Sequence, residues 1–250
     1  MKEELFDPGT GRPRPQGLYD PASEKDSCGV GFVVDIKGKK SHQIVKWGLE
    51  ILVNLEHRGA CGCEENTGDG AGMLLQVPHG FLSRECARLK IDLPAPGSYG
   101  VGMVFLPRDN NERNHCEAIL EAAIRQEGQE VLGWRDVPVD DRDLGDTARR
   151  AEPLIRQVFV GRAKELTDPL AFERKLYVIR KVAEKRVREE APRLGLRQVS
   201  SFYISSLSSQ TIVYKGMLTA SQLQHFFPDL LDESMESCLS LVHSRFSTNT

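Results

Sequence analysis

The sequence predicts a fold in which helices pack on β-sheets, and two observations support this prediction. Segments with the two-residue period of strands alternate with segments of helical period in the first half of the chain, and further strand-like segments follow in the second half. The chain has 250 residues, of which 40% are hydrophobic, so it can bury a substantial core. Periodicity alone leaves the topology of the sheets open.

The element boundaries follow from periodicity and from glycine and proline signals. Residues 1–27 are rich in proline, glycine and charge and follow neither period, so we expect them to be extended. We expect strands at residues 28–36, 72–77, 99–106, 129–138, 154–161, 198–206, 210–216 and 239–246. We expect helices at residues 41–57, 79–90, 110–127, 168–191 and 218–226. The strands at 198–206 and 210–216 should form a hairpin.

The apolar positions of the three longest helices predict which side chains face the core. In the first of them these are Ile44, Trp47, Ile51, Leu52 and Leu55. In the helix at 110–127 they are Cys116, Ile119, Leu120, Ala123 and Ile124. In the longest helix they are Phe172, Leu176, Ile179 and Val182.

Charge and composition exclude several classes of function. The formal net charge is −3, and the basic residues of the longest helix alternate with glutamates, which is typical of a solvated helix face rather than a nucleic-acid site. No apolar run approaches the about 18 residues that a membrane span requires. The acidic N-terminus does not resemble a secretory signal, and six cysteines do not suggest a disulfide scaffold. We therefore expect a cytoplasmic protein without nucleic-acid or membrane partners.

The run CGVGFV, which starts at Cys28, directly follows the polar leader. A cysteine in this place can be a small buried side chain at the start of a strand. If the bond between Ser27 and Cys28 is cut, however, Cys28 carries both a thiol and a free α-amine. The amine has a pKa of about 8, which suits it to act as the base for its own thiol. Cys28 is therefore a candidate nucleophile.

The glycine-rich segment at residues 57–72 allows three interpretations. His57, Cys61 and Cys63 could bind a metal ion, although no second cysteine pair stands at zinc spacing. The run GDGAG faintly resembles a nucleotide-binding loop but lacks the GxGxxG spacing. The segment could instead be a tight structural loop packed beside another segment, with Arg58 turned inward.

A third group of polar residues, HSRFSTNT, closes the chain from His243 onward. Arg245 stands between hydroxyl-bearing residues at the end of a strand, and its guanidinium can bind both oxygens of a carboxylate. An arginine in this place can equally be an ordinary surface residue. Spacing alone leaves both interpretations open.

Taken together, three motifs in this order resemble the glutaminase domain of the glutamate synthase large chain. They are DSCGVGF around Cys28, HRGA followed by NTGDGAG at residues 57–72, and HSRFSTNT at the end of the chain. The resemblance implies an α+β fold, namely a four-layer αββα sandwich of the N-terminal-nucleophile hydrolase type that is incomplete at the C-terminus. It also implies that residues 1–27 are a pro-segment and that residues 28–250 are the N-terminal part of a type 2 glutamine amidotransferase domain.

The resemblance further implies the roles of individual residues. The thiolate of Cys28 attacks the side-chain carboxamide of L-glutamine, a γ-glutamyl thioester forms, and water releases glutamate. Arg245 holds the substrate carboxylate, Thr248 makes a nearby polar contact, and Arg58 supports the nucleophile. The resemblance implies no metal ion in this segment, and it suggests no role for Cys61, Cys63, Cys86, Cys116 and Cys238.

In the whole enzyme, the resemblance implies that ammonia passes to 2-oxoglutarate in a downstream FMN-binding synthase domain. FMN and a [3Fe–4S] cluster carry electrons there from NAD(P)H or ferredoxin, and a small electron-transfer subunit is an implied partner. The oxyanion-hole residues and the acidic residue that binds the substrate amine are expected beyond Thr250, so the isolated piece is expected to be inactive. Two alternatives stay open, a stand-alone N-terminal-nucleophile amidase and a non-catalytic interaction module.

Overall fold

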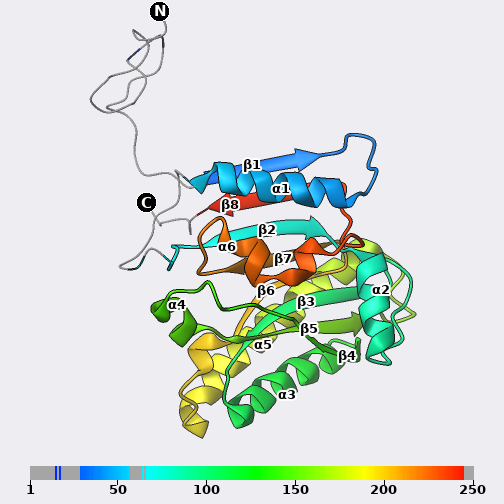
Figure 1. Ribbon diagram of the computed structural model, residues 1–250. Coiled ribbons are helices and arrows are strands. Elements are labelled where there is room, and N and C mark those ends of the chain that lie inside the picture. The colour runs from blue at the N-terminus through cyan, green and yellow to red at the C-terminus, as the bar shows by residue number, and fades with distance from the viewer. Residues whose placement is uncertain (1–14, 16, 18–28, 57–63, 65, 245–250) are drawn as a thin grey trace, which may run out of the picture.

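The computed structural model describes residues 15, 17, 29–56, 64 and 66–244, which form two antiparallel sheets with helices packed on them (Figure 1). The expected α+β class is confirmed. The strands are β1 (Gly29–Val34), β2 (Ala71–Gln76), β3 (Tyr99–Leu106), β4 (Glu130–Asp136), β5 (Leu154–Gly161), β6 (Tyr203–Ser208), β7 (Thr211–Gly216) and β8 (Leu239–Ser244). The α-helices are α1 (His42–Asn54), α2 (His79–Arg88), α3 (Asn110–Gln126), α4 (Asp146–Ala151), α5 (Pro169–Leu194) and α6 (Gln222–Phe226), with 3₁₀-helices η3 (Val199–Ser201) and η4 (Pro228–Leu231).

Sheet 1 has the strand order β1–β8–β2–β7, so the first and last described strands lie side by side (Figure 1). Gly29 of β1 lies opposite Ser244 of β8, and Ser244 also lies opposite Ala71 of β2. On its other side, Ala71 pairs with Gly216 of β7. These four residues form one row across a single end of the sheet.

Sheet 2 has the strand order β4–β5–β3–β6, and its strands come from the consecutive stretch of chain from β3 to β6, which also contains α3, α4 and α5. Because side chains alternate along a strand, Val104 and Val158 pack with α3 and α5 on one face of this sheet. On the other face, Val101, Met103 and Phe159 join the core that continues to sheet 1.

Helix α1 covers β1 and β8 on one face of sheet 1 (Figure 1). It begins and ends close to the expected boundaries, but its buried face is rotated relative to the expected one. The buried side of α1 is formed by Ile44, Val45, Gly48, Leu49 and Leu52. Trp47, which was expected in the core, is 46% exposed, because the narrow side of the helix at Gly48 is the one that approaches the sheet.

The core-facing residues of the other two long helices agree better with expectation. All five predicted positions of α3 are buried. In α5, Phe172, Leu176 and Ile179 are buried as predicted, whereas Val182 is only partly buried. The neighbouring Ala183 takes the buried place instead, so the apolar stripe of α5 drifts by one residue along this long helix.

The two strands that were expected to form a hairpin at residues 198–216 do not pair with each other in one sheet. β6 pairs with β3 in sheet 2, and β7 pairs with β2 in sheet 1. Serine hydroxyls connect the two strands: Ser205 Oγ donates to the carbonyl of Val213, and the backbone N–H of Val213 donates to Ser206 Oγ. These side chains occupy the backbone groups that a hairpin ladder would use, so the connection joins the two sheets.

Some element boundaries also differ from expectation, and one helix was not expected. Residues 199–201 form η3, so β6 begins only at Tyr203. Helix α6 begins at Gln222 rather than at residue 218. Helix α4 was not expected, because its six residues are mostly polar and only Ala148 is buried. No helix among the described residues is long and apolar enough to cross a lipid bilayer.

Candidate active site

One end of sheet 1 brings together one residue from each of the three sequence motifs. Gly29 directly follows Cys28 in the chain, Ser244 directly precedes Arg245, and Ala71 is the last but one residue of the second motif. Residues that lie opposite each other in an antiparallel sheet have Cα atoms only about 5 Å apart. The row formed by Gly29, Ser244 and Ala71 therefore brings together three parts of the chain that are far apart in sequence.

The four predicted site residues themselves, Cys28, Arg58, Arg245 and Thr248, lie outside the described residues. The same holds for His57, Cys61 and Cys63, on which the metal-site hypothesis depends. Among the residues that the structure does describe, no three His, Cys, Asp or Glu side chains gather so that they could hold a metal ion.

The described part of the second motif is a tight loop fixed to its surroundings by glycines. A Cβ atom on Gly68 would stand 2.2 Å from the carbonyl oxygen of Leu218, so only glycine fits there. Gly70 has a φ of 133°, which side-chain-bearing residues rarely adopt. The loop continues into strand β2 rather than into a helix N-terminus, so the nucleotide-loop interpretation is wrong and the structural-loop interpretation is confirmed for these residues.

Polar side chains tie this loop to α4. Thr67 Oγ1 donates to Glu64 Oε2 at 2.8 Å, and the backbone N–H of Thr147, in the first turn of α4, donates to the same oxygen at 3.1 Å. Thr147 Oγ1 donates to the other carboxylate oxygen at 3.0 Å. The backbone bond from Thr147 and the bonds from the two threonine hydroxyls lower the pKa of Glu64, so it stays ionised as the anchor of this loop.

Gln222, at the start of α6, makes a second connection, which no sequence motif predicts. Its Nε2 donates to the carbonyl of Asn66 at 3.0 Å and to the carbonyl of Asp143 at 2.7 Å. Its Oε1 accepts a hydrogen bond from the N–H of Thr219 at 2.9 Å. One buried side chain thus joins three loops around the second motif. Asn66 and Asp143 lie far from Gln222 in sequence, so only the folded chain reveals this role.

His243 begins the third motif and lies beside Gly72 of β2. A Cβ atom on Gly72 would stand 2.3 Å from Cε1 of the His243 ring, so glycine makes room for the imidazole. Burial and the nearby positive charge of Lys215 lower the pKa of His243. The ring is therefore predominantly neutral at pH 7.

Two of the described cysteines, Cys86 and Cys116, are not activated nucleophiles. Cys86, Cys116 and Cys238 are buried and form no disulfide. Burial raises the pKa of Cys86 to about 11 and that of Cys116 to about 12, so both thiols stay protonated at neutral pH. These two residues act as small apolar side chains of the core.

Comparison with known proteins decides the family. Residues 28–250 match the family described as glutamine amidotransferases class-II. The chain belongs to this family. Its fold is accordingly of the N-terminal-nucleophile hydrolase type, and the resemblance expected from the three motifs is confirmed.

The relatives of this chain are glutamate synthases from bacteria, fungi and plants. It is 51% identical over 238 residues to the glutamate synthase [NADPH] large chain of Bacillus subtilis (strain 168), with 95% of this chain and 15% of the relative covered. It is 43% identical to the glutamate synthase [NADH] of Saccharomyces cerevisiae, with 95% and 11% covered. It is 40% identical to the ferredoxin-dependent glutamate synthase 2, chloroplastic, of Arabidopsis thaliana, with 96% and 14% covered. The chain thus spans 11–15% of the length of these relatives.

Proposed function

We propose that this chain is the glutaminase part of a glutamate synthase and that Cys28 is its nucleophile. The observation that carries the proposal is the row Gly29–Ser244–Ala71, which brings the chain neighbours of Cys28, Arg245 and the second motif to one end of sheet 1. Family membership supports glutamine as the substrate, since class-II amidotransferases act on it.

In the proposed reaction, removal of residues 1–27 frees the α-amine of Cys28. The Sγ thiolate of Cys28 attacks the carboxamide carbon of glutamine, and the α-amine passes a proton to the departing nitrogen. The carbon–nitrogen bond breaks, ammonia leaves, and a γ-glutamyl thioester remains. Water then attacks the thioester carbon, the carbon–sulfur bond breaks, and glutamate and the free thiol are released.

The other predicted residues bind and orient the substrate in this proposal. Arg245 directly follows β8 and holds the substrate carboxylate with its forked guanidinium. Thr248 adds a polar contact, and Arg58 supports the nucleophile. Gly68 and Thr67 of the second motif fix residues 66–70, which lead into β2.

We further propose that this chain acts within a longer cytoplasmic polypeptide. The relatives are many times longer, and β1 exposes apolar side chains at Val30, Phe32 and Val34, which are 60%, 71% and 46% exposed. A surface of this kind is typical of a contact with further protein. In that protein, ammonia passes to a synthase part that converts 2-oxoglutarate to glutamate. FMN, the [3Fe–4S] cluster, the electron donor and a small electron-transfer subunit belong to that part.

The experiment replaces Cys28 with serine in the complete gene product that carries this chain. Glutamine-dependent glutamate formation should fall at least about a thousandfold, because the nucleophile is lost. Ammonia-dependent formation should persist, since it bypasses the thioester. Cys238→Ala serves as the matched control and should leave both activities unchanged. Glutaminase activity that survives in Cys28→Ser would exclude the assignment.

N-terminal sequencing of the same purified protein tests the processing step. A chain that starts at Cys28 supports the amine as base, and a chain that keeps Met1 favours the non-catalytic interaction module. Cleavage of simple acyl amides together with indifference to glutamine would instead favour the stand-alone amidase.

A further inference from the structure

The second motif is held by hydrogen bonds that come from two other parts of the chain. The carbonyl of Asn66 accepts one bond from Gln222 Nε2 at 3.0 Å and another from the backbone N–H of Gly145, just before α4, at 2.9 Å. Gln222 Nε2 also donates to the carbonyl of Asp143 at 2.7 Å. One amide group is thus shared between the second motif and the segment that leads into α4.

The oxygen of the same amide fixes the chain that follows β7. Gln222 Oε1 accepts a hydrogen bond from the N–H of Thr219 at 2.9 Å. The preceding residue, Leu218, lies against Gly68, where a Cβ atom would stand only 2.2 Å from the Leu218 carbonyl oxygen. Gln222 therefore acts on the second motif in two ways, directly through Asn66 and indirectly through Leu218.

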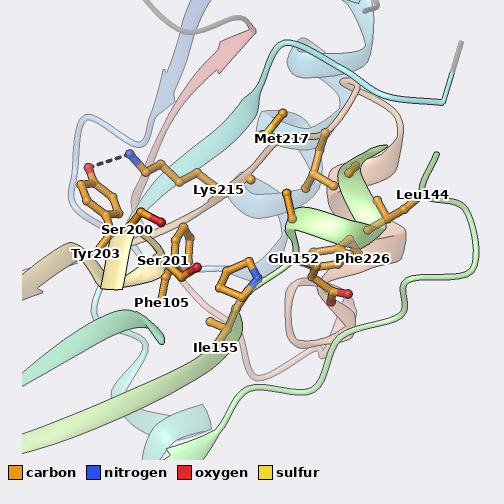
Figure 2. A pocket seen from close by; sticks show the side chains of 15 residues that line it. Phe105, Leu144, Glu152, Ile155, Ser200, Ser201, Tyr203, Lys215, Met217 and Phe226 are labelled. Atoms are coloured by element: carbon orange, nitrogen blue, oxygen red, sulfur yellow. Dashed lines mark hydrogen bonds between the residues drawn. The ribbon is translucent and has the colours of Figure 1, made fainter. Parts of the chain in front are cut away.

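Close packing does not fix these segments on every side. A cavity of about 710 Å³ lies beside them, and its lining includes Leu144 before α4, Met217 after β7 and Phe226 of α6 (Figure 2). Because free space borders both segments, their position depends on hydrogen bonds as well as on packing. Gln222 itself is only 7% exposed, so water does not replace the bonds that its amide makes.

The residues that Gln222 holds lead directly to the proposed active site. Residues 66–70 continue into β2, which begins at Ala71. Ala71 lies in the row with Ser244 and Gly29 at the end of sheet 1, and Gly216 pairs with it from the other side. The loop and this row are joined by continuous chain, so a displacement of the loop is transmitted to the end of the sheet.

We propose that Gln222 is a positioning residue for glutamine hydrolysis, whose amide holds residues 66–70 in place at the end of sheet 1. The inference rests on the proposed function. A primary amide suits this role, because it donates two hydrogen bonds and accepts others from one planar group. A misplacement of about 1 Å can cost about a hundredfold in rate, even when the substituted residue lies far from the reacting atoms.

The test replaces Gln222 with methionine, which has a similar length but makes none of the three bonds, in the complete gene product that carries this chain. The kcat of glutamine-dependent glutamate formation should fall about 10- to 100-fold. The KM for glutamine should change far less, because substrate binding is assigned to Arg245 and not to the second motif. Ammonia-dependent formation should be unchanged, since it does not use the thioester.

Gln129→Met is the matched control. Gln129 directly precedes β4 and is also 7% exposed. Its Oε1 accepts from the N–H of Ala163 at 3.0 Å, and its Nε2 donates to the carbonyl of Glu127 at 3.1 Å. Both variants remove one buried amide that bonds to backbone, so both should lose similar stability. Only Gln222→Met should lose glutaminase activity, and an equal loss of kcat in Gln129→Met would overturn the proposal.

Amide hydrogen exchange of the 250-residue chain follows the loop itself. In Gln222→Met, exchange at residues 66–70 should rise at least about tenfold, whereas in Gln129→Met it should stay at the rate of the unmodified chain. If exchange rises at every element, Gln222→Met has unfolded the chain. Gln222→Glu then takes its place, because it keeps the acceptor for Thr219 and loses both bonds to the carbonyls of Asn66 and Asp143.

Fast exchange at residues 66–70 together with an unchanged kcat would overturn the proposal, because hydrolysis would then not depend on the position of the loop. Unchanged exchange at these residues would overturn it as well. Both readouts are independent of which residue is the nucleophile. Glutaminase activity that survives in Cys28→Ser would therefore exclude the proposed function without deciding the role of Gln222.

Discussion

His243 shows how a single residue of the third motif links the site to pH. Burial and the charge of Lys215 lower its pKa below the usual value of about 6.5. The unfolded chain therefore binds a proton at this position more readily than the folded chain does. The contribution of His243 to stability is complete above pH 6.5 and is lost as the pH falls through the lowered pKa of the folded chain.

We predict that His243→Gln makes the folded chain less sensitive to acid between pH 7 and pH 5. The variant has no imidazole to protonate, so its urea midpoint should fall less over this range than that of the unmodified chain. Urea unfolding at pH 7, 6 and 5 measures this. His79→Gln is the comparison, because burial and Lys40 also lower the pKa of His79, on α2. An identical pH dependence of His243→Gln and the unmodified chain would contradict the prediction.

Sequence reasoning at the residue scale finds residues that sit inside recognisable motifs and misses those that act from a distance. Gly68 stands within the second motif, and its close approach to Leu218 agrees with the structural-loop interpretation. Gln222 stands in no motif, and its three backbone partners come from separate loops. Lys215 and Tyr203 likewise come into contact only because β7 and β6, which belong to different sheets, lie next to each other. A side chain whose partners are brought by the fold leaves no local signal.

At the scale of elements, the contact of α1 with sheet 1 depends on the absence of a side chain. A Cβ atom on Gly48 would stand 2.8 Å from Ser240 Cβ and 3.0 Å from Met73 Cε. Gly80 in α2 is also helical, but nothing lies within 4 Å of the place that its Cβ would take. The two glycines therefore differ in packing while sharing the low helix propensity of glycine.

We predict that Gly48→Ala and Gly80→Ala change stability in opposite directions. Gly48→Ala should lower the free energy of unfolding by about 1–3 kcal/mol, because overpacking outweighs the gain in helix propensity. Gly80→Ala should raise it by up to about 1 kcal/mol, because only the propensity changes. Chemical denaturation of both variants measures the difference. Stabilisation by Gly48→Ala would show that α1 can move away from the sheet at little cost.

The elements that could be predicted from the sequence are those in which hydrophobic residues recur with a clear helical or strand period. β3 and β5 have the expected boundaries, and α3 buries every expected residue. α4 could not be found, because it is held by Glu64 and Thr147 rather than by an apolar face. The prediction of a hairpin was wrong because the hydroxyl groups of Ser205 and Ser206 form hydrogen bonds with the backbone of β7, in place of backbone hydrogen bonds between the two strands.

At the scale of the whole molecule, strand order could not be read from the sequence, because pairing joins segments that are far apart in the chain. β1 pairs with β8, although about 200 residues separate them. The roles that the resemblance implies for Cys28 and Arg245, which act on one substrate, agree with this pairing. The position of sheet 2 relative to sheet 1 had no such signal, because it rests on a shared hydrophobic core and on one buried polar cluster, both built from segments far apart in sequence.

That cluster centres on Arg135 of β4. Its Nη1 and Nη2 each donate to Asp229 of η4 at 2.8 Å, and Nη1 also donates to Gln157 of β5 at 3.1 Å. Tyr214 of β7 donates its hydroxyl proton to Asp229, and Gln157 Nε2 donates to the Tyr214 oxygen. Burial and the Asp229 carboxylate raise the pKa of Tyr214, so its hydroxyl keeps the proton that it donates. Strands of both sheets thus share one hydrogen-bonded ion pair.

We predict that Asp229→Asn lowers the free energy of unfolding by about 3–5 kcal/mol, because it removes the carboxylate that accepts two hydrogen bonds from the buried guanidinium of Arg135 and leaves only the more distant Glu85, at 3.7 Å. The side chains of this pair are only 6% and 3% exposed, so water cannot replace the lost partner. Asp140→Asn, which breaks the exposed pair with Arg142, is the control and should shift the urea midpoint far less.

The double variant Arg135→Met with Asp229→Leu separates the cost of an uncompensated buried charge from the cost of lost hydrogen bonds. If the loss in Asp229→Asn comes from the stranded charge, removing both charges should recover part of the lost stability. The double variant should then keep both sheets folded but pack them less uniquely, with broader amide resonances at β5 and β7. A double variant as unstable as Asp229→Asn would mean that the hydrogen bonds among Gln157, Tyr214 and Asp229, and not the charge balance, hold the two sheets together.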